Sequence, residues 1–386
     1  MAMIAGLAVL LAAGGCGTNK PKPDQVFLMP APGIYEEGQI HPFIDNDPIG
    51  EGLQPAVLFA TDRAVAAPDD GKYDYYSHER SAAPGERFAA EIRERLARSG
   101  KKGVYVYVHG YKVNFENPVL VASELWHFLG YKGAFVAYSW PTKFSVWAYV
   151  ADLGNAESSA RNLRTLLLEI ARIDEVEKIH VIGYSAGTRI VSRVLADLGM
   201  YAHRYGKEEI AAGIELGNVI LIGSDVDRDI MSGYLLDGAL RVPDSLTLYQ
   251  SQDDGALNMS KKVYRHSRSG QMVVDGPLSP QAESFFAAHP QLRIIDVTNA
   301  EGGTDHGGHS YFRTSPWVSS DILMTLMYGL SPGERGLVKY EDFPVWDFPD
   351  DYVTRLRSAT AAADQAVGEA IRQYDGSLRD EQEATR

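Results

Sequence analysis

From about Gln54 onward, short apolar runs alternate with longer stretches in which apolar residues recur every three or four positions. Short runs bounded by turn residues predict buried strands, and the longer period predicts amphipathic helices that pack against them. The predicted strands are residues 56–60, 104–108, 134–138, 179–182, 218–222, 245–249 and 292–297, and the predicted helices are 156–172 and 188–198. Residues 85–96 fit either a helix or an extended edge segment. Strands that are apolar throughout and separated by helices indicate an α/β fold, with a mainly parallel central sheet and helices on both faces.

Composition divides the chain into further parts around this pattern. Residues 17–53 are rich in Pro, Gly, Asn and Asp, which predicts a flexible tether that leads into a folded domain at residues 54–330. Residues 331–386 are Pro-rich and aromatic and end in an acidic, Ala-rich helix that begins near Asp351. We expect this last part to be a solvated C-terminal extension.

Residues 1–16 contain an apolar run that ends in small residues and Cys16, the only cysteine of the chain. The run is too short for a permanent membrane-spanning helix but suits a signal peptide. It resembles the lipobox of bacterial lipoproteins, which implies that Cys16 is acylated and anchors the protein in the cell envelope. An ordinary cleaved signal would instead give a periplasmic or secreted protein, and a buried N-terminal helix is the third interpretation. With Cys16 acylated, no thiol is left for disulfides, metal binding or thiol catalysis.

The formal net charge of −14 limits the partners of the protein. A chain this acidic is poorly suited to neutralise a phosphate backbone or to bind an anionic membrane through a basic face. We therefore expect no nucleic-acid partner, and small molecules, neutral polymers or proteins remain.

The segment Gly183-Tyr-Ser-Ala-Gly187 matches the pattern G-x-S-x-G. It lies between a predicted strand and a predicted helix, the context of a nucleophile elbow, in which a tight turn exposes a serine above the sheet. The helix N-terminus beside Ser185 also offers N–H donors and a favourable field for a developing oxyanion. We interpret Ser185 as a nucleophile; the alternative is a Ser/Gly turn without a catalytic role.

A serine nucleophile needs a general base. His309 follows the last predicted strand and a Gly-rich loop, where we expect the base, and His306 is its rival. Both could instead join Asp305 in a metal site, but no third partner at metal-ligand spacing is evident. We therefore expect neither a metal nor another cofactor.

The base in turn needs an acid that orients it, and the acid should follow a strand between the serine and the histidine. Asp254 or its neighbour Asp253 comes soon after the strand that ends at Tyr249, whereas Asp225 follows the preceding strand. Most of these aspartates must be turn or capping residues, because one carboxylate is enough.

Two backbone N–H groups are needed to bind the oxyanion of a tetrahedral intermediate. We expect one from Ala186, directly after the nucleophile, and the other from Tyr111, in the His109-Gly-Tyr loop after the strand 104–108. The glycine of this loop would let the backbone approach the substrate closely. His109 is interpreted as a structural residue that braces the loop by hydrogen bonds.

Taken in order, the runs 105–111, 138–141, 181–189, 251–257 and 309–312 resemble a family of bacterial α/β-hydrolases of largely unassigned function. Members resemble lipases and esterases in their elbow and are often envelope proteins or lipoproteins. The resemblance covers about residues 54–329. It implies the α/β-hydrolase fold and a triad of Ser185, Asp254 and His309, and it does not indicate the substrate.

These residues lead us to expect a serine hydrolase that cleaves a small-molecule or lipid-like carboxylic ester through an acyl-enzyme. An amidase, a thioesterase or an acyltransferase would use the same residues. The alternative of a different class is a non-catalytic envelope lipoprotein that uses the scaffold for binding; it predicts loss of the serine, the histidine or the oxyanion loop, and all are present. The aromatic side chains of residues 138–147 could line an apolar pocket or pack as a lid.

Overall fold

The structure is a computed structural model that describes residues 57–61, 78–111, 113, 116–142, 149–255, 257, 268–271, 278–302, 309–340, 344–365, 367–369 and 372. The predicted signal segment 1–16 with Cys16, the tether 17–53, and residues Asp305 and His306 lie outside the described residues. The limits of the predicted domain at 54–330 stay a prediction.

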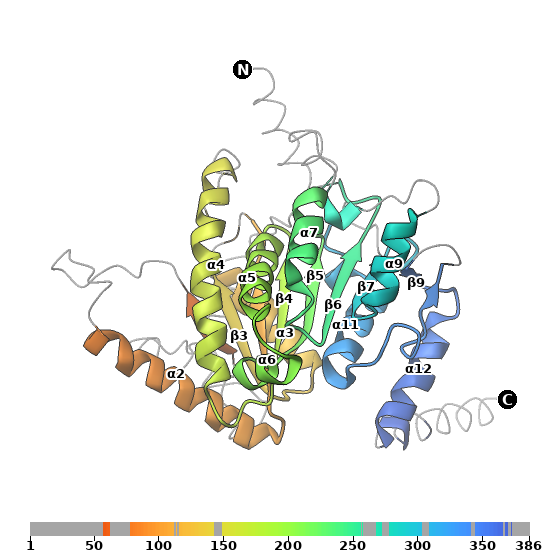
Figure 1. Ribbon diagram of the computed structural model, residues 1–386. Coiled ribbons are helices and arrows are strands. Elements are labelled where there is room, and N and C mark those ends of the chain that lie inside the picture. Colours follow the sequence, from red (N-terminus) through yellow and green to blue (C-terminus); the bar gives the residue numbers. More distant parts are fainter. Residues whose placement is uncertain are drawn as a thin grey trace.

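A nine-stranded sheet forms the centre of the described part of the chain (Figure 1). In chain order its strands are β1 (Val57–Thr61), β2 (Gly103–Val108), β3 (Ala134–Ser139), β4 (Lys178–Tyr184), β5 (Leu216–Ile222), β6 (Ser245–Gln250), β7 (Leu292–Asp296), β8 (Val338–Lys339) and β9 (Val345–Asp347). Their order in the sheet is β1-β3-β2-β4-β5-β6-β7-β9-β8, and all neighbours are parallel except β8 and β9. Each strand predicted from the apolar runs is present, and the mainly parallel α/β fold is confirmed.

Helices cover both faces of the sheet. Those described are α2 (His78–Ser99), α3 (Glu116–Phe128), α4 (Tyr149–Ala171), α5 (Gly187–Ala202), α6 (Lys207–Gly213), α7 (Arg228–Tyr234), α9 (Pro280–Ala288), α10 (Tyr311–Thr314), α11 (Pro316–Tyr328) and α12 (Tyr352–Ala363), with short π and 3₁₀ turns at η3 (Leu235–Ala239) and η4 (Ser269–Gln271). Residues 85–96, which fitted either a helix or an edge segment, belong to helix α2.

Strand β2 shows how the two cores are separated. Its residues Val104, Val106 and Val108 pack with apolar residues of α2, α4, α5 and α7 on one face. The alternate residues Tyr105 and Tyr107 pack with α3, α11 and α12 on the other face. This two-sided burial explains why the strands are apolar throughout, since successive side chains of a strand point to opposite faces.

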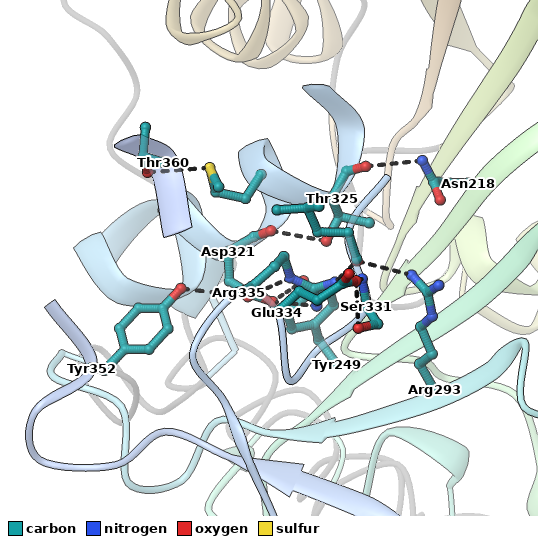
Figure 2. Close-up of polar contacts among 12 residues, drawn as sticks. Asn218, Tyr249, Arg293, Asp321, Thr325, Ser331, Glu334, Arg335, Tyr352 and Thr360 are labelled. Atoms are coloured by element: carbon teal, nitrogen blue, oxygen red, sulfur yellow. Dashed lines mark hydrogen bonds and ion pairs between the residues drawn. The ribbon is translucent and has the colours of Figure 1, made fainter. Parts of the chain in front are cut away.

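The chain after residue 330 completes the sheet, because β9 pairs with β7 and β8 pairs with β9. Arg335 and Asp321 are both fully buried and form a two-pronged ion pair, with Nε–Oδ1 and Nη2–Oδ2 distances of 2.7 and 2.9 Å (Figure 2). The hydroxyl of Tyr249 on β6 donates to Oδ2 of the same carboxylate at 2.6 Å, and that of Tyr352 contacts Oδ1 at 3.4 Å. We expected residues 331–386 to be a solvated extension, and this is wrong for Arg335, β8, β9 and Tyr352. These parts are held against the sheet by strand pairing and by a buried polar cluster, which composition does not reveal.

Candidate active site

Ser185 lies in a tight turn between β4 and α5. Its backbone has φ of +51°, the left-handed region that few residues other than glycine adopt. Its N–H donates to the carbonyl of Ile222 at 2.9 Å, and the N–H of Thr188 donates to its own carbonyl at 3.0 Å. Only glycine fits at position 187, since a Cβ there would lie 2.5 Å from the carbonyl oxygen of Val108. This strained strand-to-helix turn has the geometry of a nucleophile elbow.

The structure brings three of the predicted site residues into one chain of hydrogen bonds. Nε2 of His309 lies 2.9 Å from the hydroxyl oxygen of Ser185, and Nδ1 lies 2.7 Å from Oδ2 of Asp254. The exposed fractions of Ser185, His309 and Asp254 are 7%, 3% and 0%, so the contacts are shielded from solvent. The other oxygen of Asp254 accepts the N–H of Leu257 at 3.0 Å, which fixes the orientation of the carboxylate.

The hydrogen bonds of His309 determine which of its ring nitrogens carries the proton. Because an ionised carboxylate can only accept, Nδ1 of His309 carries the proton that is shared with Asp254. Nε2 then has a lone pair that faces the hydroxyl of Ser185. The three residues follow the ends of β4, β6 and β7, where the carboxyl ends of parallel strands meet.

The alternative acid, Asp225, is not brought to the histidine but lies in a cluster of cations. Its carboxylate pairs with Nε of Arg189 at 3.1 Å and with Nε of Arg268 at 3.5 Å. Its backbone N–H donates to the hydroxyl of Thr188 at 3.2 Å, which ties it to the elbow helix. The local sequence pattern left Asp225 open as an alternative, because its partner Arg268 is distant along the chain and gives no local signal, whereas the family resemblance implied Asp254.

Both backbone segments expected to bind an oxyanion lie beside Ser185. A Cβ on Gly110 would be 2.9 Å from Cβ of Ser185, so the loop that leads to Tyr111 passes directly against the serine. Ala186 is the N-cap residue of α5, directly before Gly187. The first N–H groups of a helix have no acceptor within the helix, and the positive end of its dipole favours a negative charge there.

His109 braces this loop with both of its ring nitrogens. Nε2 accepts the backbone N–H of Trp140 at 3.1 Å, so Nδ1 carries the ring proton and donates to the carbonyl of Gly110 at 2.7 Å. The indole N–H of Trp140 donates to the carbonyl of His109 at 2.7 Å, and the two rings stack with centroids 5.5 Å apart. Trp140 is buried and packs this loop, whereas Tyr138 is buried in the core and its hydroxyl donates to the carbonyl of Ser159 at 3.0 Å; residues 143–148 lie outside the described part.

Two tyrosines that the sequence did not single out also contact this site. Tyr184 precedes the serine; its hydroxyl donates to the carbonyl of His309 at 3.3 Å, and its ring centroid lies 5.2 Å from the imidazole. Tyr311 follows the histidine by two residues and is fully buried. Only the three-dimensional placement of these side chains distinguishes them from other aromatic core residues.

Within the residues that the structure describes, no group of three or more His, Cys, Asp and Glu side chains is arranged to hold a metal ion. None of the described helices has both the length and the apolar character needed to cross a bilayer.

A mainly parallel sheet, a serine elbow after a central strand, and an aspartate and a histidine after later strands together define the α/β-hydrolase class. The chain belongs to the family described as alpha/beta hydrolase of unknown function (DUF900), whose profile matches residues 85–326, more than half of the sequence. The resemblance inferred from the motifs and the α/β-hydrolase fold are thereby confirmed.

Two solved structures show a distant similarity to the chain. A proposed cell surface hydrolase from Lactobacillus plantarum WCFS1 is 14% identical with a TM-score of 0.34, over 61% of this chain and 94% of that chain. Inhibited esterase B from Lactobacillus rhamnosis is 12% identical with a TM-score of 0.34, over 59% of this chain and 76% of that chain. No curated protein matches the chain significantly. Similarities this weak carry no information about the substrate.

Proposed function

We propose that the protein is a serine hydrolase that cleaves carboxylic esters through an acyl-enzyme. The observation that carries this proposal is the buried chain of hydrogen bonds from Ser185 through His309 to Asp254, at 2.9 and 2.7 Å. Family membership supports a hydrolase but leaves the bond that is cleaved open.

In the proposed mechanism the hydroxyl oxygen of Ser185 attacks the ester carbonyl while Nε2 of His309 takes the hydroxyl proton. The carbonyl π electrons move to the oxygen and form a tetrahedral oxyanion. When the C–O bond to the leaving group breaks, the imidazolium returns the proton to the departing alcohol, and Ser185 is left acylated. Water activated by His309 then releases the acid and restores the serine. Asp254 keeps its negative charge throughout and stabilises the imidazolium.

The N–H groups of Ala186 and Tyr111 are assigned to the oxyanion. A donor of this kind contributes on the order of 3 kcal/mol to the stability of the transition state in comparable enzymes. The left-handed backbone of Ser185 supports this assignment, because the tight turn places the hydroxyl close to the start of α5.

A fluorophosphonate probe and p-nitrophenyl butyrate test the proposal together. We expect the wild-type chain to be labelled and to release p-nitrophenol, and Ser185→Ala to lose both. Ser192→Ala is the matched control, because Ser192 is another buried serine, on the helix that follows the elbow, and should keep both signals. Absence of labelling and of turnover in the folded wild-type chain would leave the binding-scaffold alternative as the better account.

The same acyl group offered as an anilide distinguishes an amidase, and an added alcohol distinguishes an acyltransferase by forming a new ester. A series of acyl-chain lengths then reports the size of the acyl pocket. We expect hydrolysis of the ester to exceed both other reactions.

We also propose that the protein acts in the cell envelope, anchored through Cys16. The support is the apolar run that ends in small residues and a cysteine. Metabolic labelling with a palmitate analogue in a bacterial host tests this, since labelled wild-type chain and unlabelled Cys16→Ser are expected. A wild-type chain that is recovered unlabelled would contradict the anchor.

A further inference from the structure

The hydroxyl of Tyr311 bridges the ends of two strands beneath the candidate site. It donates to the carbonyl of Tyr249 on β6 at 2.8 Å and accepts the N–H of Gly223, just after β5, at 2.7 Å. The side chain is fully buried, so no water competes for these bonds. Because Tyr311 follows His309 by two residues, this bridge fastens the histidine segment to the sheet.

Both ends of the bridge are close to the hydrogen-bonded pair of His309 and Asp254. Gly223 lies directly under it, since a Cβ there would be 3.1 Å from Cε1 of His309 and 3.5 Å from Oδ2 of Asp254. Tyr249 lies near the end of β6, from which a short segment leads to Asp254. The hydroxyl of Tyr311 therefore holds three parts of the site together: Gly223 beside the imidazole, the end of β6 that leads to Asp254, and the segment that carries His309.

The hydroxyl also keeps its proton. Burial, followed by the charge of the nearby Asp254, raises the pKa of Tyr311 well above its ordinary value. The donor to Tyr249 is therefore present at every pH at which the protein would work.

From this geometry we propose that Tyr311 is a positioning residue, whose hydroxyl holds the imidazole of His309 in line between Asp254 and Ser185. It does not touch the reacting atoms and acts through the backbone of Gly223 and Tyr249. Because this role rests on the function proposed above, its test includes one readout that needs no substrate.

Tyr311→Phe removes the hydroxyl and keeps the ring. The variant should fold, because the N–H of Gly223 has a second acceptor in the carbonyl of Tyr249 at 3.3 Å. The matched control is Tyr352→Phe. Tyr352 is equally buried, but its hydroxyl contacts Asp321 in the C-terminal polar cluster (Figure 2). Both variants lose one buried hydroxyl, so a merely structural effect would appear in both.

The first readout is turnover of p-nitrophenyl butyrate. We expect Tyr311→Phe to lower kcat about tenfold with KM nearly unchanged, as for a misaligned base, and Tyr352→Phe to match the wild type. The second readout is the downfield proton resonance of the Nδ1–H of His309, identified by its loss in Asp254→Asn. It should shift or broaden in Tyr311→Phe and stay unchanged in Tyr352→Phe.

An unchanged resonance in Tyr311→Phe overturns the positioning role whatever the rate, and so does an equal change in Tyr352→Phe. If the wild-type chain turns over no ester, the proposed function fails, whereas the resonance still decides whether Tyr311 holds the imidazole.

Discussion

Asp254→Asn is the sharpest perturbation of the candidate site, because the structure fixes how the new amide must orient. In the native chain one carboxylate oxygen accepts from Nδ1 of His309 at 2.7 Å, and the other accepts the N–H of Leu257 at 3.0 Å. An asparagine has only one oxygen for these two donors. The buried N–H of Leu257 cannot reverse its role, so the oxygen should stay with Leu257 and the NH₂ group should face the imidazole.

This orientation forces His309 into the wrong tautomer. Nδ1 must then accept from the amide, so the ring proton moves to Nε2, which can no longer take the proton of Ser185. An exchanged tautomer of this kind costs about 10⁴-fold in kcat in a related triad, or about 5.5 kcal/mol of transition-state stabilisation. We expect a loss of that size here with little change in KM.

Asp225→Asn is the control, measured in the same single-turnover assay with p-nitrophenyl butyrate between about pH 7 and 9, above the ordinary pKa of histidine. Its carboxylate pairs with Arg189 and Arg268, so its loss should lower the free energy of unfolding by about 3 kcal/mol and leave most of kcat. The reasoning is refuted if Asp254→Asn keeps more than about a tenth of kcat, far above the loss expected for the wrong tautomer, or if only Asp225→Asn stops turnover while both variants are folded.

Three further predictions concern stability. Burial lowers the pKa of His180 to about 4, so between the ordinary 6.5 and 4 only the unfolded chain binds the proton. Stability in urea should fall by up to about 3 kcal/mol as the pH drops through this window, and less steeply in His180→Asn; equal slopes would contradict this. Gly187→Ala should cost about 2 kcal/mol or more in thermal melts because its Cβ would meet the carbonyl oxygen of Val108 at 2.5 Å, whereas Gly85→Ala, with open space around it, should cost nothing. Arg335→Met should lower the free energy of unfolding, measured in urea, by about 3–5 kcal/mol, because the charge of Asp321 is then buried without its partner. Adding Asp321→Asn should recover part of that loss, and strictly additive losses would argue against the pair.

The sheet could be predicted from the sequence because two-sided burial leaves a local pattern. Strands such as β2 and β5 are apolar at most positions, and that pattern does not depend on which strands become neighbours. Strand β9 has only three residues, and its burial depends on the partner strand β7. It is too short for a hydrophobic pattern to predict it. Arg335 shows the same limit, since a buried arginine is explained only by Asp321.

Some residues of the candidate site could also be predicted from the sequence, and others could not. Ser185 carries a local signal, because a tight strand-to-helix turn needs glycines at fixed positions, and His309 could be placed by its order along the chain. For the acid, the family resemblance implied Asp254, whereas the local pattern alone left Asp225 open, because both aspartates follow strands and differ only in what the fold brings to them. Tyr311 gave no signal at all, since its role depends on the ends of two other strands.

The pairing of β9 with β7 also bears on where the folding unit ends. The family match stops at residue 326, before Arg335, β8 and β9. A chain cut there would leave β7 with an open row of N–H and C=O groups, a template for aggregation, and the carboxylate of Asp321 without its cation. The boundary of shared sequence is therefore not the boundary of a soluble unit. Moving this hydrolase core into another chain requires the residues through β9 to cover the edge of β7, and those through Tyr352 to complete the polar cluster around Asp321.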